Sequence, residues 1–361
     1  MSPSLRFPEF TGEWEKCKIE DITDAVSSGK SKNHFSNGEY NLYGSTGIIG
    51  RTDKALYDGK LVLVARVGAN AGFLQIINEP CGITDNTLIL KPKGIDAFYL
   101  YYFLQHFNLN RLIFGSGQPL ITGGMLKKVK VSLGTISEQS KIVKFLSLLD
   151  ERTAVQSRLI EDLKKLRCAI VEKMFKQSKA NGRLGDFIEQ VSVRNKNGLY
   201  SNVLSVSNKQ GFVKQSEQFE DRAVASEDTS NYKIVKRNNF AYNPARINVG
   251  SIARLTKFDV GIVSPMYVCF RTKASIIPEY MEAFFTSQQF FYEMMKRLEG
   301  SVRLCLSYEG LCNIPVYIPD MNKQIAMGQN ISLILSKIGL EIEYLGRLHQ
   351  QKQYLLRKMF I

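Results

Sequence analysis

The chain has 361 residues, 44% of them hydrophobic and only 10 of them proline, which predicts a folded protein large enough for two domains and excludes a disordered one. Lys and Arg number 48 against 34 Asp and Glu, a net charge of +14 that favours a polyanionic partner, nucleic acid ahead of a membrane. No apolar run is long enough to span a bilayer and the six cysteines form no C-x-x-C pair, so we expect a cytoplasmic protein with reduced thiols and without a zinc site.

The first part of the chain, about residues 15–135, is rich in short β-type runs broken by Gly and Asn. Its clearest strands are predicted at "LVLVARV" (61–67), "NTLILKP" (86–92) and "KVKVSL" (128–133), with one helix at "IDAFYLYYFLQHF" (95–107). A stretch without Gly or Pro then runs from about Ser137, a plausible N-cap, to Phe175. This stretch predicts one helix of about 38 residues, on the order of 57 Å long.

The same order of elements follows again. Strands are predicted at "FAYNPA" (240–245), "MYVCFRT" (266–272) and "IPVYIP" (314–319), one helix within residues 277–298, and a second long helix up to Phe360. "VEKMF" (171–175) and "LRKMF" (356–360) mark the two helix ends and fix an offset of 185 residues. Upstream, "ARVGANAGF" (65–73) aligns with "ARINVGSI" (245–252) after small gaps. We infer two copies of one module, about residues 15–175 and 183–360.

Both long helices carry an apolar heptad stripe with one polar interruption. In the first helix, Ile142, Leu149, Leu163 and Ile170 share one heptad position, and Phe145, Leu159 and Leu166 lie three residues further on; in the second, Met327, Ile334, Leu348 and Leu355 share it, with Ile331, Ile338 and Leu345 beside them. The interruptions, Gln156 and Glu341, are of the kind that fixes register. We therefore expect an antiparallel coiled coil; two separate core helices are the alternative.

The predicted fold class is α+β, with two tandem repeats that each consist of a β-rich domain and a long helix. The expected boundaries are residues 1–135 and 179–318 for the β-rich domains, and 136–178 and 319–361 for the helices.

Fragments that resemble catalytic motifs are incomplete. "SSGKS" (27–31) has Asp24 where a phosphate-binding loop requires glycine, and "YNPAR" (242–246) lacks the second proline and the aromatic residue of an adenine methyltransferase loop. "RVGANAG" (66–72) lacks the βαβ context of a dinucleotide fingerprint, and the three histidines are scattered. We therefore predict no active site.

Side chains able to read base edges are better placed, because they occur in loops that follow predicted strands. The candidates for DNA binding are Lys30, Lys32, Asn33, Arg66, Asn70, Ser116 and Gln118 in the first copy, and Arg194, Lys196, Asn197, Arg246, Asn248 and Arg303 in the second. Solvated turns without a ligand are the alternative interpretation of each loop.

The opening "LRFPEFTGEWEKCKIEDI" (5–22), the helix start "EQSKIVKFLSLLD" (138–150) and the two K-M-F helix ends resemble the DNA-specificity subunits of type I restriction–modification systems. The likeness covers essentially the whole chain. The second helix departs from the usual pattern, because Leu335 stands where the family has an aspartate.

The resemblance implies two target-recognition domains held apart by a helical spacer, in a non-catalytic subunit that directs its partners to an asymmetric bipartite site in double-stranded DNA. The implied partners are two methyltransferase subunits, which use S-adenosylmethionine, and two restriction–translocase subunits, which use ATP and Mg; no cofactor is expected in this chain and no membrane is involved. The competing function is an interaction scaffold, with two ligand-binding β domains on a coiled coil and a protein or RNA partner.

Overall fold

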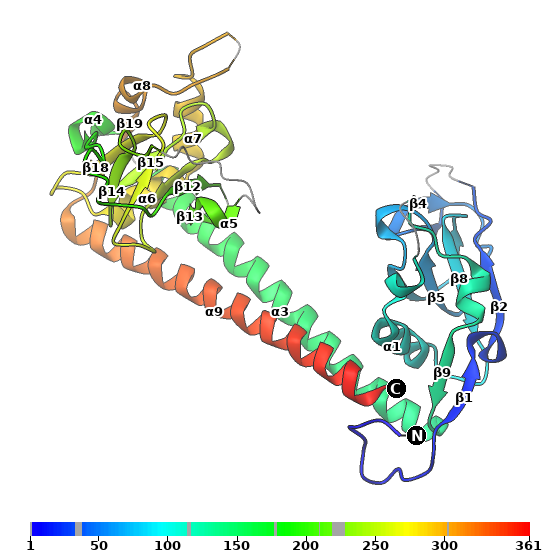
Figure 1. Cartoon of the computed structure of the whole chain (residues 1–361). Helices are drawn as coiled ribbons and strands as arrows, with labels where there is room; N and C mark the ends of the chain where they lie inside the picture. Colours follow the sequence, from blue (N-terminus) through cyan, green and yellow to red (C-terminus); the bar gives the residue numbers. More distant parts are fainter. Residues whose placement is uncertain are drawn as a thin grey trace. The chain divides into compact units, whose positions relative to one another are not determined.

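The structure is a computed structural model that describes residues 2–32, 38–113, 117–176, 179–208, 210–218, 228–301 and 303–361. The chain forms two compact units, residues 1–157 with 343–361 (unit 1) and residues 158–342 (unit 2). Each unit contains a β-rich part and a section of both long helices, α3 (Ile136–Lys176) and α9 (Met321–Met359) (Figure 1).

Unit 1 is built from short strands and short helices that precede α3. Its strands are β1 (Glu15–Lys18), β2 (Thr23–Ser28), β3 (Tyr40–Gly44), β4 (Gly47–Thr52), β5 (Lys60–Ala65), β6 (Leu74–Asn78), β7 (Cys81–Ile83), β8 (Thr87–Pro92) and β9 (Lys130–Leu133). Its helices are η1 (Ile19–Ile22), η2 (Gly68–Asn70), α1 (Ala97–Phe107), η3 (Leu109–Leu112) and α2 (Gly123–Lys127).

The main sheet of unit 1 has the strand order β2-β8-β5-β6 and is antiparallel throughout. Alternate residues of its central strands face opposite sides, and both sides are covered. Val62 and Val64 pack with α1, whereas Leu61 and Leu63 pack toward β7, which pairs with β3 in the order β4-β3-β7. This burial on both faces explains why β5 is a continuous apolar run rather than an alternating one.

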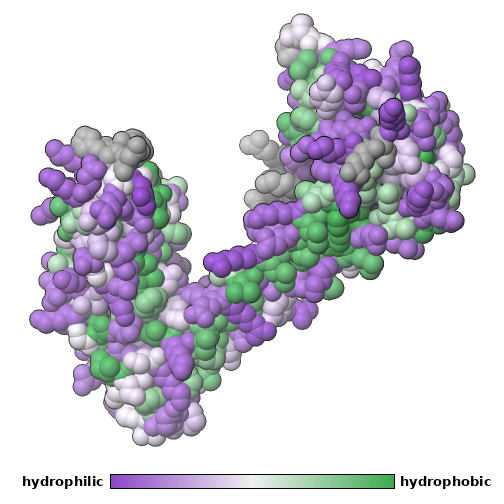
Figure 2. All heavy atoms as spheres, turned by 180° about the vertical axis from the view of Figure 1, so that it is seen from behind, coloured by the Kyte–Doolittle hydropathy of each residue, from purple (hydrophilic) through white to green (hydrophobic). Residues whose placement is uncertain are grey.

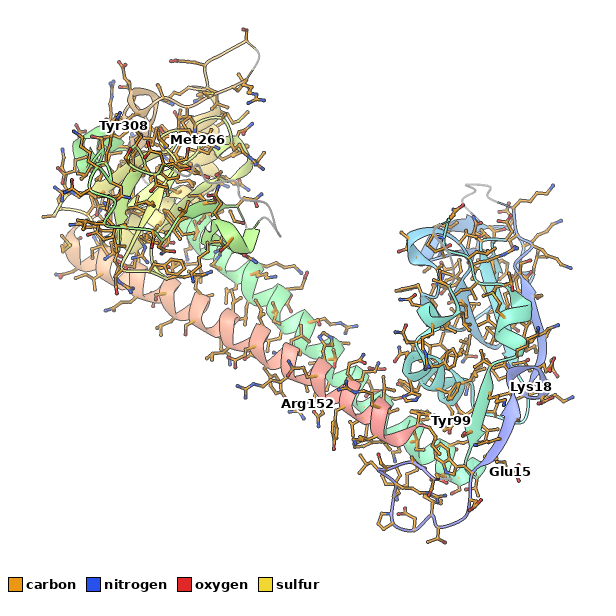
Figure 3. The ribbon with its side chains drawn as sticks, in the orientation of Figure 1. Glu15, Lys18, Tyr99, Arg152, Met266 and Tyr308 are labelled. Carbon is orange, nitrogen blue, oxygen red and sulfur yellow. The ribbon has the colours of Figure 1, made fainter. Side chains whose placement is uncertain are left out.

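Helix α1 begins and ends at polar caps. The Asp96 carboxylate accepts hydrogen bonds from the backbone N–H groups of Phe98 and Tyr99, and Asn108 closes the helix in the left-handed conformation at φ 57°. The buried face of α1 contacts Phe360, whose ring centroid lies 5.2 Å from that of Tyr99, a residue labelled in Figure 3.

Unit 2 repeats this plan. Its strands are β10 (Gly182–Arg183), β11 (Ile188–Gln190), β12 (Leu204–Ser207), β13 (Gly211–Lys214), β14 (Lys233–Lys236), β15 (Phe240–Tyr242), β16 (Ile252–Arg254), β17 (Val260–Val263), β18 (Val268–Thr272) and β19 (Pro315–Val316). Its helices before α9 are α4 (Leu184–Phe187), α5 (Gln215–Gln218), η4 (Ile247–Val249), α6 (Pro278–Phe285), α7 (Gln288–Met295) and α8 (Tyr308–Cys312). The order β11-β18-β15-β16 matches β2-β8-β5-β6, and the pair β10-β19 matches β1-β9. The duplicated module is therefore confirmed.

Two local predictions were wrong. The single helix expected within residues 277–298 is two helices, because Ser287 caps a new helix by accepting a hydrogen bond from the Phe290 N–H. Helix α3 begins at Ile136, the expected boundary, but its cap is Thr135 and not Ser137, because Thr135 Oγ1 accepts the hydrogen bond from the Glu138 N–H at 3.3 Å.

The long helices pack on each other in opposite directions, as predicted. In unit 1 the start of α3, with Ile142 and Leu146, packs on the end of α9, with Leu355 and Met359. In unit 2 the end of α3 shares a core with Ile331 near the start of α9.

The second seam position of α3 differs from the prediction. Phe145, Leu159 and Leu166 are 40%, 40% and 50% exposed, whereas Leu146 and Ile160 are 0% and 4% exposed. The seam of α3 therefore uses the position four residues after the Ile142 heptad position, not three. In α9 the predicted Ile331 and Ile338 do occupy this +4 position and are buried.

Polar contacts also join the helices within unit 1. Lys352 Nζ lies 2.6 Å from the Asp150 carboxylate and 5.3 Å from the Tyr102 ring centroid. Arg152, labelled in Figure 3, lies over the Tyr344 ring at 5.3 Å. These pairs specify which residues of the two helices face each other.

Candidate nucleic-acid interface

One edge of the main sheet in unit 1 brings the candidate residues together. Strands β2 and β5 both run antiparallel to β8, so both end at the edge where β8 begins. Lys30 and Lys32 follow β2, and Arg66 and Asn70 follow β5. Backbone hydrogen bonds from Gly29 N–H to the Thr87 carbonyl (3.0 Å) and from Arg66 N–H to the Asn86 carbonyl (2.9 Å) hold both segments against the same turn.

The loop that carries Gln118 joins the same edge. The Gly68 N–H donates to the Pro119 carbonyl at 3.0 Å, and the Ile121 N–H donates to the Arg66 carbonyl at 2.9 Å. Gln118 is exposed beside η2. The other two candidates of this copy, Asn33 and Ser116, lie outside the described residues.

The edge of unit 1 is basic. Lys30 and Lys32 are exposed and, with Lys54, line a cavity of about 340 Å³ that also contains Asp53. Arg66 is half-buried, and within the described part of the chain its buried Nε has no hydrogen-bond partner.

The corresponding edge of unit 2 collects the second set of candidates. Strands β11 and β15 both run antiparallel to β18, so the segments after them leave the same edge. Arg194, Lys196 and Asn197 follow β11 and are exposed. Arg246 and Asn248 follow β15.

Arg303 lies on a loop that joins this edge. The Leu306 N–H donates to the Pro244 carbonyl at 3.1 Å, and the Arg303 side chain is exposed. Arg194 donates through Nη1 to Asn231 Oδ1 at 3.0 Å.

The loop that follows β5 in unit 1 and the loop that follows β15 in unit 2 are closed by the same backbone hydrogen bond, which we call the loop frame. Ala65 N–H bonds the Phe73 carbonyl, and Asn243 N–H bonds the Ser251 carbonyl, so each loop spans the same number of residues. Gly72 and its counterpart Gly250 stand one residue before the end of each loop. Their φ angles are +87° and +88°, a left-handed conformation that favours glycine.

This frame corrects the sequence alignment of the loops. The strand pairs Val64–Leu74 and Tyr242–Ile252 are equivalent, which sets an offset of 178 residues within this loop. Arg66 therefore corresponds to Pro244, and the shared "A-R" of the sequence is misleading.

Further polar residues line a groove of about 620 Å³ beside η2 and were missed from the sequence. They are Gln105, Asn108, Asn110, His349, Lys352 and Gln353. They come from α1, η3 and α9, which only the fold brings next to Asn70. No sequence signal within any one of these segments marks them.

The described residues contain no group of three or more His, Cys, Asp or Glu side chains that could hold a metal ion. None of the described helices combines the length and the hydropathy required to cross a membrane.

Comparison with known proteins identifies the fold and the family. Residues 11–165 match the family described as the type I restriction modification DNA specificity domain, and unit 2 repeats the same sheet order. The fold resembles that of the crystal structure of the type I restriction–modification S subunit from M. genitalium, with a TM-score of 0.65 and 20% identity over 100% of this chain and 99% of that one. Residues 11–165 therefore belong to the type I restriction–modification DNA specificity domains.

Other specificity subunits show lower coverage. The EcoprrI specificity subunit of Escherichia coli is 28% identical over 115 residues, which are 32% of this chain and 29% of that protein. A Mycoplasma genitalium protein described as a type I specificity subunit is 28% identical over 189 residues, 50% of this chain and 49% of that protein. The matches thus span less than half the length of these curated relatives. A type I specificity subunit is the non-catalytic member of its system, in agreement with the prediction.

Proposed function

We propose that this specificity subunit recognises an asymmetric, bipartite site in double-stranded DNA, with one half-site for each unit. The observation that carries the proposal is the pair of matched sheet edges, which have the same loop frame but unlike side chains. Equal frames suit equivalent positions on two half-sites, and unlike side chains suit different base sequences.

The charge supports DNA as the ligand. The chain has a net charge of +14, and exposed Lys30, Lys32, Arg194, Lys196 and Arg303 lie at the two edges. Cations at a loop edge neutralise phosphates and release counterions, so affinity for DNA should fall steeply with salt.

Methylation-aware sequencing of a host that expresses the subunit with its methyltransferase tests the proposal. We expect a motif with two unlike halves and a gap. Exchange of residues 179–318, the proposed second recognition domain, for those of a relative should change only one half. A continuous motif, or a change in both halves, would contradict the proposal. RNA that displaced duplex DNA in binding assays would favour the scaffold function instead.

The long helices offer a surface for the partner subunits. Leu148 and Val155 of α3 are 56% and 63% exposed, and their counterparts at the 185-residue offset, Leu333 and Leu340 of α9, are 69% and 61% exposed. Apolar side chains also form green patches along the helices in Figure 2. Two copies of one partner can use such repeated contacts, and we propose that they are the methyltransferase subunits.

In this proposal S-adenosylmethionine, ATP and Mg belong to the methyltransferase and restriction subunits. Co-purification of this chain with the methyltransferase subunit tests the docking surface. Leu340→Asp and Val155→Asp should each weaken assembly while the melting temperature of the isolated chain stays unchanged. Unchanged assembly in both variants would contradict the docking surface.

A further inference from the structure

Asn70 and Asn248 occupy the same place in the two matched loops. Each lies five residues after the backbone group that begins the loop, Ala65 or Asn243, and two residues before the left-handed glycine. Asn70 is exposed and Asn248 is half-exposed. In the part of the chain that the structure describes, neither carboxamide has a hydrogen-bond partner.

The neighbouring positions of the two loop frames are not alike. Gly68 of unit 1 corresponds to Arg246 of unit 2 at the 178-residue offset. Gln118 corresponds to Arg303 at the 185-residue offset. The backbone hydrogen bonds confirm this offset, because Ile121 N–H donates to the Arg66 carbonyl and Leu306 N–H donates to the carbonyl of Pro244, the counterpart of Arg66. Asparagine is thus the shared polar side chain of two frames whose other polar side chains differ.

The surroundings of Asn70 suit a ligand with polar edges. The groove beside it presents four further carboxamides, from Gln105, Asn108, Asn110 and Gln353, and no carboxylate is among its lining residues; Lys352 also lines the groove, with its ammonium paired to Asp150. In unit 2 a carboxamide also lies close by, since Asn208 Nδ2 donates to the carbonyl of Val249, the residue after Asn248, at 3.3 Å.

A carboxamide has one acceptor and one donor at the spacing of the adenine N6–H and N7 groups, whereas a guanidinium matches the two acceptors of guanine. We propose, on the basis of the DNA-binding function above, that Asn70 and Asn248 each read an adenine in their own half-site. The positions at which the two units carry different side chains make the two half-sites differ. Arg246 and Arg303 read guanine in the second half-site, where unit 1 has Gly68 and Gln118.

The experiment uses the full chain in complex with its methyltransferase subunit. Binding is measured for duplexes in which each base pair of the methylated motif is replaced in turn. The wild-type complex should lose about 5- to 150-fold in affinity at each position that is read. Asn70→Ala should lose discrimination at a single adenine–thymine pair in one half, and Asn248→Ala at a single adenine–thymine pair in the other half. Arg246→Ala should relax a guanine–cytosine pair in that second half only.

Asn78→Ala is the matched control, because Asn78 is an exposed asparagine at the opposite edge of the same sheet, paired with Lys60. It should leave discrimination unchanged at every position. Unchanged melting temperatures will show that each variant is folded. If the wild-type complex binds its motif and Asn70→Ala and Asn248→Ala discriminate as it does, or relax only guanine–cytosine pairs, this inference is wrong and the proposed function stands. If the wild-type complex does not discriminate between duplexes at all, the proposed function itself fails.

Discussion

The repeated K-M-F sequence predicts a large and local loss of stability when its phenylalanine is removed. Phe360 is 3% exposed, and its ring lies 5.2 Å from Tyr99, 5.9 Å from His106 and 6.3 Å from Phe103 between centroids. Truncation of such a buried ring to alanine removes the packing and leaves a cavity, at a cost of about 3–5 kcal/mol. For a unit of this size we expect a fall in melting temperature of roughly 6–20 °C.

The second K-M-F end supplies a matched experiment. Phe175 is 1% exposed and lies 5.3 Å from Tyr280 and 5.2 Å from Phe284. Phe175→Ala should therefore destabilise unit 2 about as much as Phe360→Ala destabilises unit 1, with the two losses additive. Urea unfolding with hydrogen exchange measures each loss and assigns it to its unit. Ile361→Ala, at a residue that is 39% exposed, is the control. A loss for Phe360→Ala of less than about 1 kcal/mol, or equal to that of the control, would refute the packing argument.

The other predictions concern the seam, the helix start and pH. Leu348→Asp, at a residue 3% exposed, should lower the free energy of unfolding measured in urea by about 4 kcal/mol or more, whereas Leu340→Asp, at a residue 61% exposed, should leave it almost unchanged. Equal losses for the two variants would contradict the assigned seam. Gln324→Leu should lower the free energy of unfolding more than Gln139→Leu, by about 1–3 kcal/mol for each buried partner left unpaired. The Gln324 side chain accepts from Ile277 N–H and donates to two carbonyls, whereas the Gln139 side chain donates to only one carbonyl among the described residues. The reverse order of stability in thermal melts would contradict this. Burial lowers the pKa of His106, an effect that Arg111 reinforces and a hydrogen bond to the Leu356 carbonyl opposes. The unfolded chain then binds the proton more readily than the folded chain, so the stability contributed by the neutral His106 is lost progressively as the pH falls below about 6.5. His106→Gln should therefore show a smaller fall in melting temperature between pH 7.5 and 5.5 than wild type. Identical pH profiles would contradict a buried neutral imidazole.

The sequence predicts the elements of this fold well, because each leaves a local pattern. Short apolar runs mark the strands, and a stretch without Gly or Pro marks each long helix. The second seam position of α3 was wrong because the helix has apolar residues both three and four positions after the Ile142 heptad position: Leu146 and Ile160 are buried, whereas Phe145, Leu159 and Leu166 are 40–50% exposed. Periodicity alone does not tell an inner stripe from an outer one.

The site is less accessible to sequence reasoning. The candidates that follow strands do gather at one edge in each unit, because a strand end is a local feature. The groove beside Asn70 is different, since Asn110 and Gln353 are separated by more than two hundred residues and only the tertiary fold places them together. Local identity even misled, because the shared "A-R" pairs Arg66 with Arg246 while the strand register pairs it with Pro244.

The division of the chain into units has a consequence for its synthesis on the ribosome. Unit 2 is continuous, residues 158–342, and all its core residues leave the ribosome before any residue of 343–361. Unit 1 is discontinuous, and its core lacks Leu355, Met359 and Phe360 until residues 343–361 are translated. We therefore expect unit 2 to complete its core before unit 1, although the first half of unit 1 is made first. Until residues 343–361 emerge, α1 and the start of α3 expose the apolar surface that α9 later covers, and a chaperone that binds this nascent chain should bind there.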